Sequence, residues 1–280
     1  MLIVIATPIG NLADMSFRAI QALKEADYVL AEDTRRSSIL LNHYGIQKKL
    51  TSYHKFKEKH ALASILQDLQ EGKILALLSD AGTPCISDPG QSLIEACIQK
   101  GIVVQAVPGP CSLIQALVLS GFSFERFQFI GFLPKKSGAL LKATLSYPGP
   151  TVAFESPERL VKTLALIDPE REVAVLREMT KMFEECVRGK VKKLREHFQN
   201  HPPKGEIVIV VGPGAKKDEM SVEETIQMLM QFHGLSLKEA IRQAARLKGL
   251  PKRKVYGLTV KKKGFQIICP GSETIEEEPT

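Results

Sequence analysis

Three short loops rich in glycine, proline and small polar residues carry the strongest chemical pattern in the sequence. They occupy residues 7–11, 79–84 and 108–112, and each follows an apolar run that predicts a strand. In an open parallel sheet, ligands bind outside the carboxyl ends of the strands. Glycine lets a ligand approach the backbone closely, and proline stiffens a loop. Each loop alone would be an ordinary turn before a helix, but together they predict one binding crevice.

The form of the first loop excludes two common classes of nucleotide-binding protein. It has a single glycine, Gly10, two residues after Pro8, so the GxGxxG pattern of dinucleotide-binding folds is missing. The phosphate-binding pattern GxxxxGK[ST] is also missing. In the second loop, Asp80 could accept hydrogen bonds from an ammonium or hydroxyl group of a ligand.

Composition narrows the class of protein further. The 280 residues contain 38 Lys and Arg against 31 Asp and Glu, a formal charge of +7 that is compatible with an RNA partner. The five cysteines include no CxxC pair, which argues against a disulfide framework or a cysteine zinc site and favours a reducing, cytoplasmic location. No apolar run reaches the roughly 20 residues that a membrane span needs, so no membrane partner is expected. The six histidines show no zinc-ligand spacing, so no metal is expected either.

Apolar runs alternate with helical patterns along the chain, which is typical of an α/β fold. Continuous apolar runs such as residues 74–78 indicate strands buried on both faces, hence a largely parallel sheet. We therefore expect two α/β domains, residues 1–119 and 120–215, and a helical basic tail, residues 216–280. Strands are expected at residues 2–6, 28–31, 73–78, 102–107, 127–132, 151–154, 172–176, 183–188 and 206–211, the second set partly antiparallel. Helices are expected at residues 16–26, 34–44, 58–70, 91–100, 136–146, 157–167, 190–199 and within 221–260.

Nine short motifs, in order over residues 1–211, resemble the tetrapyrrole methylase superfamily and, within it, the 16S rRNA cytidine 2′-O-methyltransferase family, also called ribosomal RNA small subunit methyltransferase I. They read TPIGNL at 7–12, AEDTR at 31–35, SDAGTP at 79–84, DPG at 88–90, VPGPCS at 107–112, GFLP at 131–134, FES at 154–156, REMTK at 177–181 and KGE at 204–206. Each motif alone is weak, but nine in the family order are specific.

This resemblance implies two α/β domains of the tetrapyrrole methylase type, with S-adenosylmethionine in a cleft between them, and a homodimer. The implied reaction is methyl transfer to the ribose 2′-hydroxyl of a cytidine in the decoding region of small-subunit rRNA. For the cofactor, the loops and the resemblance together predict Pro8, Ile9, Gly10, Asp80, Ala81, Gly82, Thr83, Ser112, Phe154 and Leu176 as binding residues.

The catalytic residues are harder to predict. Methyl transfer from a sulfonium needs an aligned oxygen, and a neutral hydroxyl attacks better with a base or a positive field beside it. Charged residues at or after strand ends could supply either: Glu155, Arg177, Glu178 and Lys181, with Glu32, Asp33 and Arg35 as the matching group of the first domain. The alternative is an ion-pair network that stabilises the domain interface.

Basic residues near aromatic side chains predict an RNA-binding surface. The candidates are Arg35, Lys55, Lys57, Lys135, Lys136, Lys252 and Arg253, although a charge run is also typical of an ordinary solvated face. Two other functions remain open: a methyltransferase of the same fold acting on a small tetrapyrrole, and a non-catalytic RNA-binding protein. The basic tail favours RNA over a tetrapyrrole, and the three intact loops favour an enzyme over a binding protein.

Overall fold

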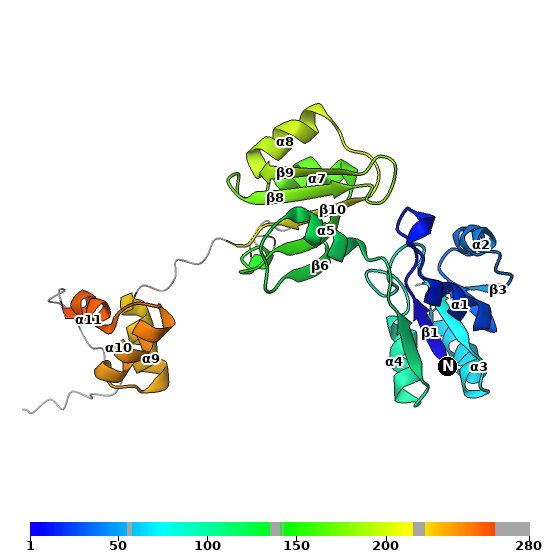
Figure 1. Cartoon of the computed structure of the whole chain (residues 1–280), viewed down its shortest axis with the longest axis horizontal. Coiled ribbons are helices and arrows are strands. Elements are labelled where there is room, and N and C mark those ends of the chain that lie inside the picture. Colours follow the sequence, from blue (N-terminus) through cyan, green and yellow to red (C-terminus); the bar gives the residue numbers. More distant parts are fainter. Residues whose placement is uncertain (55–57, 135–140, 142, 215–221, 261–280) are drawn as a thin grey trace, which may run out of the picture. The chain divides into compact units, whose positions relative to one another are not determined.

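The computed structural model describes residues 1–54, 58–134, 141, 143–214 and 222–260. It divides into two compact units, Met1–Gly214 and Ala215–Thr280. The first unit contains two five-stranded sheets, and the second contains helices (Figure 1). No helix of the described residues is long and apolar enough to cross a membrane.

The first sheet is parallel throughout. Its strands run in the order β3-β2-β4-β1-β5, and every neighbouring pair is parallel. Alternate residues of β1 enter different cores: Ile3 packs toward α1 and α2, whereas Leu2 packs toward α3 and α4. The elements are β1 (Leu2–Ile5), η1 (Leu12–Asp14), α1 (Phe17–Glu25), β2 (Tyr28–Ala31), α2 (Thr34–His43), β3 (Lys49–Ser52), α3 (Glu58–Gln70), β4 (Leu75–Leu78), α4 (Gln91–Gln99) and β5 (Val104–Val107).

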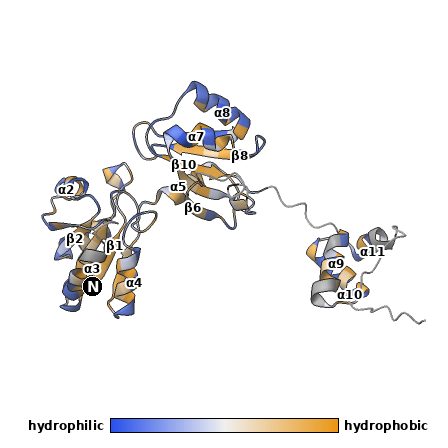
Figure 2. Cartoon of the chain, turned by 180° about the vertical axis from the view of Figure 1, so that it is seen from behind, coloured by the Kyte–Doolittle hydropathy of each residue, from blue (hydrophilic) through white to orange (hydrophobic). Residues whose placement is uncertain are grey.

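The second sheet is mixed, with strand order β6-β7-β10-β8-β9. Strand β6 is parallel to β7, whereas β10 is antiparallel to both of its neighbours and β9 is antiparallel to β8. Helices α7 and α8 cover one face and α5 the other, and the strands between them are strongly apolar (Figure 2). The elements are α5 (Ser112–Ser120), β6 (Gln128–Phe132), β7 (Thr151–Glu155), α7 (Pro157–Leu164), β8 (Glu172–Arg177), β9 (Glu185–Lys190), α8 (Val191–Asn200) and β10 (Ile207–Val211).

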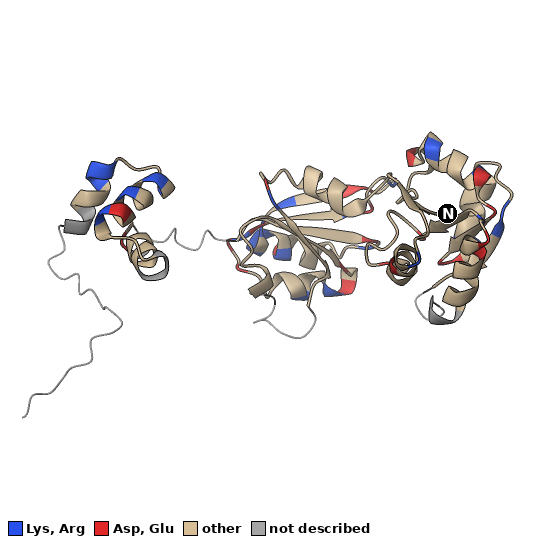
Figure 3. Ribbon diagram, turned by 90° about the horizontal axis from the view of Figure 1, so that it is seen from below, with Lys and Arg blue, Asp and Glu red and all other residues tan. Residues whose placement is uncertain are grey.

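The second unit consists of α9 (Val222–His233), α10 (Leu237–Leu247) and α11 (Lys252–Val260) around a small apolar core. A capping box starts α10: Ser236 accepts from the helix backbone, and Glu239 accepts from the Ser236 backbone N–H. The opposite face of α10 is charged, and the unit carries much basic surface (Figure 3). Its helical, basic character agrees with the expectation for the tail.

The expected α/β architecture and most expected elements are present, but three elements were not predicted: the short helix η1, strand β3 and helix α5. Strand β3 is short and polar because it lies at the edge of its sheet, so it lacks the apolar pattern of a buried strand. Helix α5 buries one apolar face on the second sheet and also carries apolar residues on its exposed face, so its sequence lacks a clear helical period. The expected helix at 136–146 lies mostly outside the described residues.

Candidate active site

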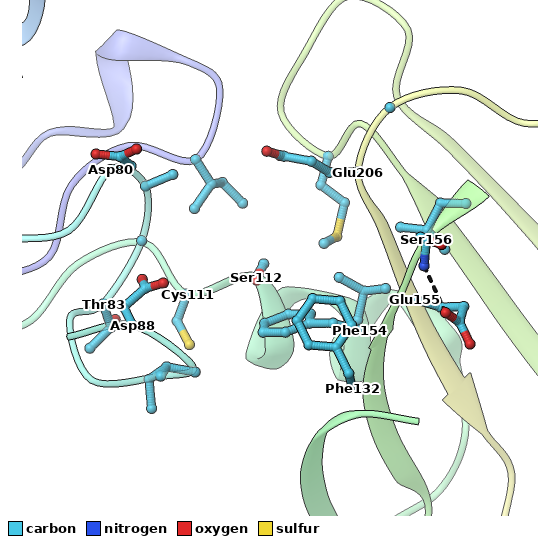
Figure 4. Close-up of a pocket in the computed structure, with 18 of the residues that line it drawn as sticks. Asp80, Thr83, Asp88, Cys111, Ser112, Phe132, Phe154, Glu155, Ser156 and Glu206 are labelled. Atoms are coloured by element: carbon cyan, nitrogen blue, oxygen red, sulfur yellow. Dashed lines mark hydrogen bonds between the residues drawn. The ribbon is translucent and has the colours of Figure 1, made fainter. Parts of the chain in front are cut away.

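A cavity of about 420 Å³ lies in the first unit, with walls from both sheets. Its lining residues are Ile9, Arg36, Asp80, Ala81, Gly82, Thr83, Ile86, Asp88, Cys111, Ser112, Phe132, Phe154, Glu155, Ser156, Pro157, Met179, Gly205, Glu206, Ile207 and Val208. Figure 4 places the carboxylates of Asp80 and Asp88 on the side of the first sheet, across the open space from Phe154 and Glu206. Its volume lies within the range of about 300–1,000 Å³ that is usual for small-molecule sites.

Hydrogen bonds fasten the three loops of the first sheet into one wall. The backbones of Thr7 and Gly82 exchange two bonds, with N···O distances of 2.9 and 3.0 Å. The Thr83 hydroxyl donates to the Pro110 carbonyl at 3.1 Å, which joins the second loop to the third. Gly82 has a φ of +82°, and a Cβ there would lie 3.3 Å from the Ile9 side chain. A larger residue at position 82 would therefore be strained and would press on the wall.

Negative charge gathers on this wall. Burial raises the pKa of Asp88 to about 6, and repulsion from Glu32 and Asp80 adds to the shift, although the Ser79 hydroxyl opposes it by hydrogen bonding. Burial and then repulsion from Asp80 also raise the pKa of Glu32. Asp80 accepts from the Asp33 backbone N–H at 2.9 Å. Carboxylates whose pKa is raised in this way suit a ligand that brings positive charge.

The wall from the second sheet is mainly apolar. Antiparallel pairing places the start of β10 beside the ends of β7 and β8, because Ile207 pairs with both Glu155 and Arg177. Apolar side chains from these strand ends, including Phe154 and Val208, face the cavity. Phe154 also makes an edge-to-face contact with Phe132, with ring centroids 5.7 Å apart. The arrangement suits the flat face of an aromatic ligand group.

Glu155 reaches the cavity lining, but its carboxylate is engaged elsewhere. Its side chain is 0% exposed and accepts from the Ser156 backbone N–H at 2.8 Å and from the Thr163 hydroxyl at 2.6 Å. The Arg159 guanidinium lies 3.3 Å away. The three partners are the N-cap of α7 and two residues within the helix, so this carboxylate ties the helix to β7. Its bonds favour the structural alternative over the predicted catalytic role.

The other predicted catalytic residues form ion pairs beside the cavity. The Lys181 ammonium lies 2.9 Å from both Glu178 Oε1 and Glu206 Oε2, and the Glu206 backbone N–H donates to Glu178 Oε1 at 2.9 Å. That backbone bond and the lysine lower the pKa of Glu178. Arg177 pairs with Glu185 at 2.9 Å. Of this network, Glu206 lines the cavity, so these contacts too favour a positioning role.

The segment at residues 178–181 packs against the first loop. A Cβ at Gly10 would lie 2.4 Å from Lys181 Cγ and 2.8 Å from the Thr180 hydroxyl oxygen, so position 10 accepts only glycine without movement. The segment carries backbone strain, since Glu178 and Thr180 have φ values of +51° and +66°. The loop of the first sheet is thus held in place from the second sheet.

Most residues predicted to bind the cofactor meet in this cavity. Seven line it: Ile9, Asp80, Ala81, Gly82, Thr83, Ser112 and Phe154. Pro8 and Gly10 line an adjoining, smaller cavity, and Leu176 is a fully buried core residue. The sequence analysis missed Arg36, Asp88 and Met179. The DPG motif at 88–90 was a signal for Asp88, whereas nothing in the pattern distinguished Arg36 from Arg35.

The predicted RNA-binding residues lie in separate places. Arg35 is 88% exposed and makes a two-pronged ion pair with Asp33. Lys252 and Arg253 are exposed at the start of α11 in the second unit. Lys55, Lys57, Lys135 and Lys136 lie outside the described residues. Among the described residues, no group of histidine, cysteine and carboxylate side chains could hold a metal ion.

Similarity to known proteins runs over most of the chain. The family model described as Tetrapyrrole (Corrin/Porphyrin) Methylases matches residues 1–195. Ribosomal RNA small subunit methyltransferase I of Thermotoga maritima is 48% identical over 75% of this chain and 97% of its own length. The protein of the same name from Halalkalibacterium halodurans is 41% identical over 92% of this chain and 93% of its own.

Solved structures confirm the expected fold class. Diphthine synthase superposes with a TM-score of 0.60 at 16% identity, covering 76% of this chain and 90% of its own. Uroporphyrin-III-C-methyltransferase from Thermus thermophilus gives a TM-score of 0.55 at 20% identity, covering 75% of this chain and 93% of its own. With the sequence identities above, the predicted resemblance is confirmed. The chain belongs to the tetrapyrrole methylase family and, within it, to the family of ribosomal RNA small subunit methyltransferase I.

Proposed function

We propose that this protein methylates small-subunit (16S) ribosomal RNA, at the ribose 2′-hydroxyl of a cytidine in the decoding region, with S-adenosylmethionine as methyl donor. The observation that carries the proposal is the cavity that joins the two sheets, in a chain whose relatives are named as ribosomal RNA small subunit methyltransferases. When bound, S-adenosylmethionine would supply an electrophilic methyl group on a positively charged sulfur.

The residues of the cavity fit this cofactor. It combines an aromatic base, a ribose and an amino acid with a positively charged sulfonium. Phe154, Met179 and Val208 offer an apolar surface for the base, and the backbone around Gly82 can approach a ligand closely. Asp80 and Asp88 offer carboxylates to the positive groups. Binding of a cation would lower the raised pKa of Asp88 and favour its charged form. The negative charge of this wall therefore complements the positive charge of S-adenosylmethionine.

The residues of the chain act mainly by binding and alignment. The apolar wall excludes water and fixes the plane of the base, and the acidic wall fixes the opposite end of the ligand. We assign Glu178, Lys181 and Glu206 to positioning, because their ion pairs hold the segment that packs on Gly10. Glu155 anchors α7 to the second sheet.

RNA is favoured over a small tetrapyrrole by the second unit. Its α10 presents Lys238, Arg242 and Arg246 on the exposed face, and Lys252 and Arg253 are exposed on α11. Such cations contact RNA phosphates, and a small tetrapyrrole would not need them. We therefore propose that the tail binds the RNA and that the two sheets form the catalytic domains. We also propose that the protein works in the cytoplasm, where it meets the ribosomal subunit.

A homodimer belongs to the same proposal. Helix α5 exposes Ile114 and Val118, which are 45% and 65% accessible and lie one helical turn apart. Beyond β8, Met182 and Phe183 are 91% and 68% accessible. Apolar side chains exposed to this extent are typical of an interface with another chain. Analytical ultracentrifugation of the full chain tests this: a dimer is expected, and a concentration-independent monomer would contradict it.

The reaction is tested by incubating the protein with unmethylated small ribosomal subunits and isotopically labelled S-adenosylmethionine. Digestion to nucleosides and mass spectrometry should recover label in 2′-O-methylcytidine. A parallel reaction with a porphyrinogen should give no labelled product. Label in a base rather than a ribose would overturn the proposed position, and calorimetry that detects no cofactor binding would overturn the enzyme assignment altogether.

A further inference from the structure

A second, smaller cavity of about 150 Å³ adjoins the first. It lies between the first loop and α2, and it shares Arg36 and Asp80 with the larger cavity. Its lining residues are Thr7, Pro8, Gly10, Leu12, Arg36, Ser37, Ile39, Leu40, Ser79 and Asp80. The side chains that separate the two spaces are therefore an arginine and an aspartate joined by an ion pair.

The smaller cavity has the chemistry of a sugar-phosphate site. Its lining includes apolar side chains, such as Pro8 and Leu40, and the buried hydroxyl residues Thr7 and Ser79, whose oxygens keep the capacity to accept a hydrogen bond. An arginine stands at its boundary, where its planar fork can bind two oxygens of a phosphate. Its volume is below the range of about 300–1,000 Å³ for a whole cofactor or drug-sized ligand. One ribose with its phosphate is a guest of suitable size and polarity.

Arg36 is held loosely enough to take a phosphate. Its guanidinium lies 3.5 Å from Asp80, and its side chain is 65% exposed. A long, exposed ion pair of this kind contributes little free energy, so exchanging it for a phosphate costs little. The neighbouring Arg35 differs, because Asp33 occupies its fork through bonds of 2.8 and 3.1 Å. Arg35 also lines neither cavity among the residues that the structure describes.

We propose that the smaller cavity receives the ribose and phosphate of the RNA nucleotide to be methylated, with Arg36 binding the phosphate. This inference rests on the proposed function and names the acceptor subsite beside the cofactor. Because the two cavities share Arg36 and Asp80, the acceptor ribose would lie next to the space proposed for the methyl donor, and both side chains would face the nucleotide and the cofactor.

The first test replaces Arg36 in the full chain by methionine and by lysine. Arg18→Met, an exposed position on α1, is the control for the loss of one positive charge. Binding of a short single-stranded RNA of decoding-region sequence is followed by fluorescence anisotropy, and cofactor binding by calorimetry. Loss of a charge-assisted phosphate contact should weaken RNA binding by about 10- to 100-fold in Arg36→Met, with a partial recovery in Arg36→Lys. Cofactor affinity should fall less than RNA affinity, because Arg36 borders the larger cavity only through its long ion pair with Asp80.

A matched pair of variants on α2 tests the place of the phosphate. Ile39 lines the smaller cavity and is 68% exposed, so substitution there should preserve folding. Ile39→Glu puts a carboxylate beside the proposed phosphate, and Ile39→Gln has the same size without the charge. The glutamate variant should bind RNA more weakly than the glutamine variant, most clearly at low salt, because added ions screen the repulsion.

Several outcomes would overturn the inference while leaving the proposed function intact. If the wild type methylates RNA but Arg36→Met binds RNA as Arg18→Met does, Arg36 does not hold the phosphate. If Arg36→Met loses cofactor affinity as much as RNA affinity, Arg36 serves only to orient Asp80. Equal RNA binding by the two Ile39 variants would place the phosphate elsewhere. Absence of RNA methylation by the wild type would instead refute the proposed function.

Discussion

The two sheets of the first unit build the cavity by different rules. In the first sheet all strands are parallel, so its contributions come from the loops that follow strand ends and from the first turns of the helices after them. In the second sheet β10 runs against its neighbours, so the wall combines the ends of β7 and β8 with the start of β10. Residues 205–208 line the cavity although they precede or open a strand. Strand direction therefore decides which residues a sheet can offer to a site.

The two sheets also differ in the chemistry of the side chains that they present to the cavity. The first sheet presents carboxylates whose pKa values are raised by burial and by repulsion from neighbouring carboxylates. The second sheet presents apolar side chains, and its charged residues are largely bonded to one another. One wall is thus prepared to bind charge, and the other to bind a flat apolar surface and to hold the structure together.

The largest expected effect is on ligand binding, from Asp80→Asn. The variant keeps the size of the side chain but removes its charge, so it loses a charge-assisted contact to the cofactor. Calorimetry should detect S-adenosylmethionine binding that is weaker by about 10- to 100-fold, with a similar loss of methylation. The melting temperature should change little, because the asparagine carbonyl oxygen can still accept from the Asp33 backbone N–H. Glu196→Gln, on the exposed face of α8, serves as control. If Asp80→Asn bound the cofactor as tightly as the wild type, the carboxylates of the first sheet would not be part of the cofactor site.

The opposite behaviour is expected of Glu155→Gln in the second sheet. Ser156 N–H and Thr163 O–H now donate to the two separate carboxylate oxygens, and the glutamine NH2 would replace one of these acceptors by a donor. Unfolding free energy should fall by about 1–3 kcal/mol, measured by denaturant titration. Glu158→Gln, exposed in the first turn of the same helix, should change it by only about 0.5 kcal/mol. If Glu155→Gln were as stable as the wild type but inactive, the carboxylate would be a catalytic group after all.

The difference between the parallel first sheet and the mixed second sheet also explains which parts of the site the sequence could predict. Loops 7–11, 79–84 and 108–112 were found because the parallel arrangement follows from continuous apolar strands, and parallel strands bring their ends to one edge. Leu176, which was predicted from the resemblance, is fully buried in the core cluster that also holds Phe154 and Val208, and it is not among the residues that line the cavity. Arg36 could not be separated from Arg35, because the choice depends on which of two carboxylates each guanidinium meets in three dimensions.

Gly205 tests the positioning role of the second wall. It has a φ of +85°, and a Cβ there would lie 2.4 Å from Glu178 Oε1. Gly45 is a matched control, because its φ is +63° but a Cβ there would meet nothing within 4 Å. Gly45→Ala should cost only the left-handed penalty of about 1–2 kcal/mol. Gly205→Ala should lose more stability than that in a thermal melt and should also weaken methylation, since it displaces Glu178. Equal losses in the two variants would show that Glu178 moves freely and positions nothing.

The smallest expected effect concerns Asp88, whose pKa is raised from 3.8 to about 6 in the folded protein. The folded state therefore holds the proton more tightly than the unfolded state, so this group contributes stability below pH 4 that is lost as the pH rises through about 6. Asp88→Asn cannot ionise, so without ligand it should melt like the wild type near pH 4 and at a higher temperature than the wild type at pH 7. The effect is modest because the side chain is only half-buried and solvent screens its charge.

With S-adenosylmethionine present at pH 7 the order should reverse, because only the wild type gains a carboxylate facing a positive ligand. Parallel melting curves for both proteins at every pH would mean that Asp88 is already ionised without the ligand, and the charge complementarity of the first wall would then rest on Asp80 alone.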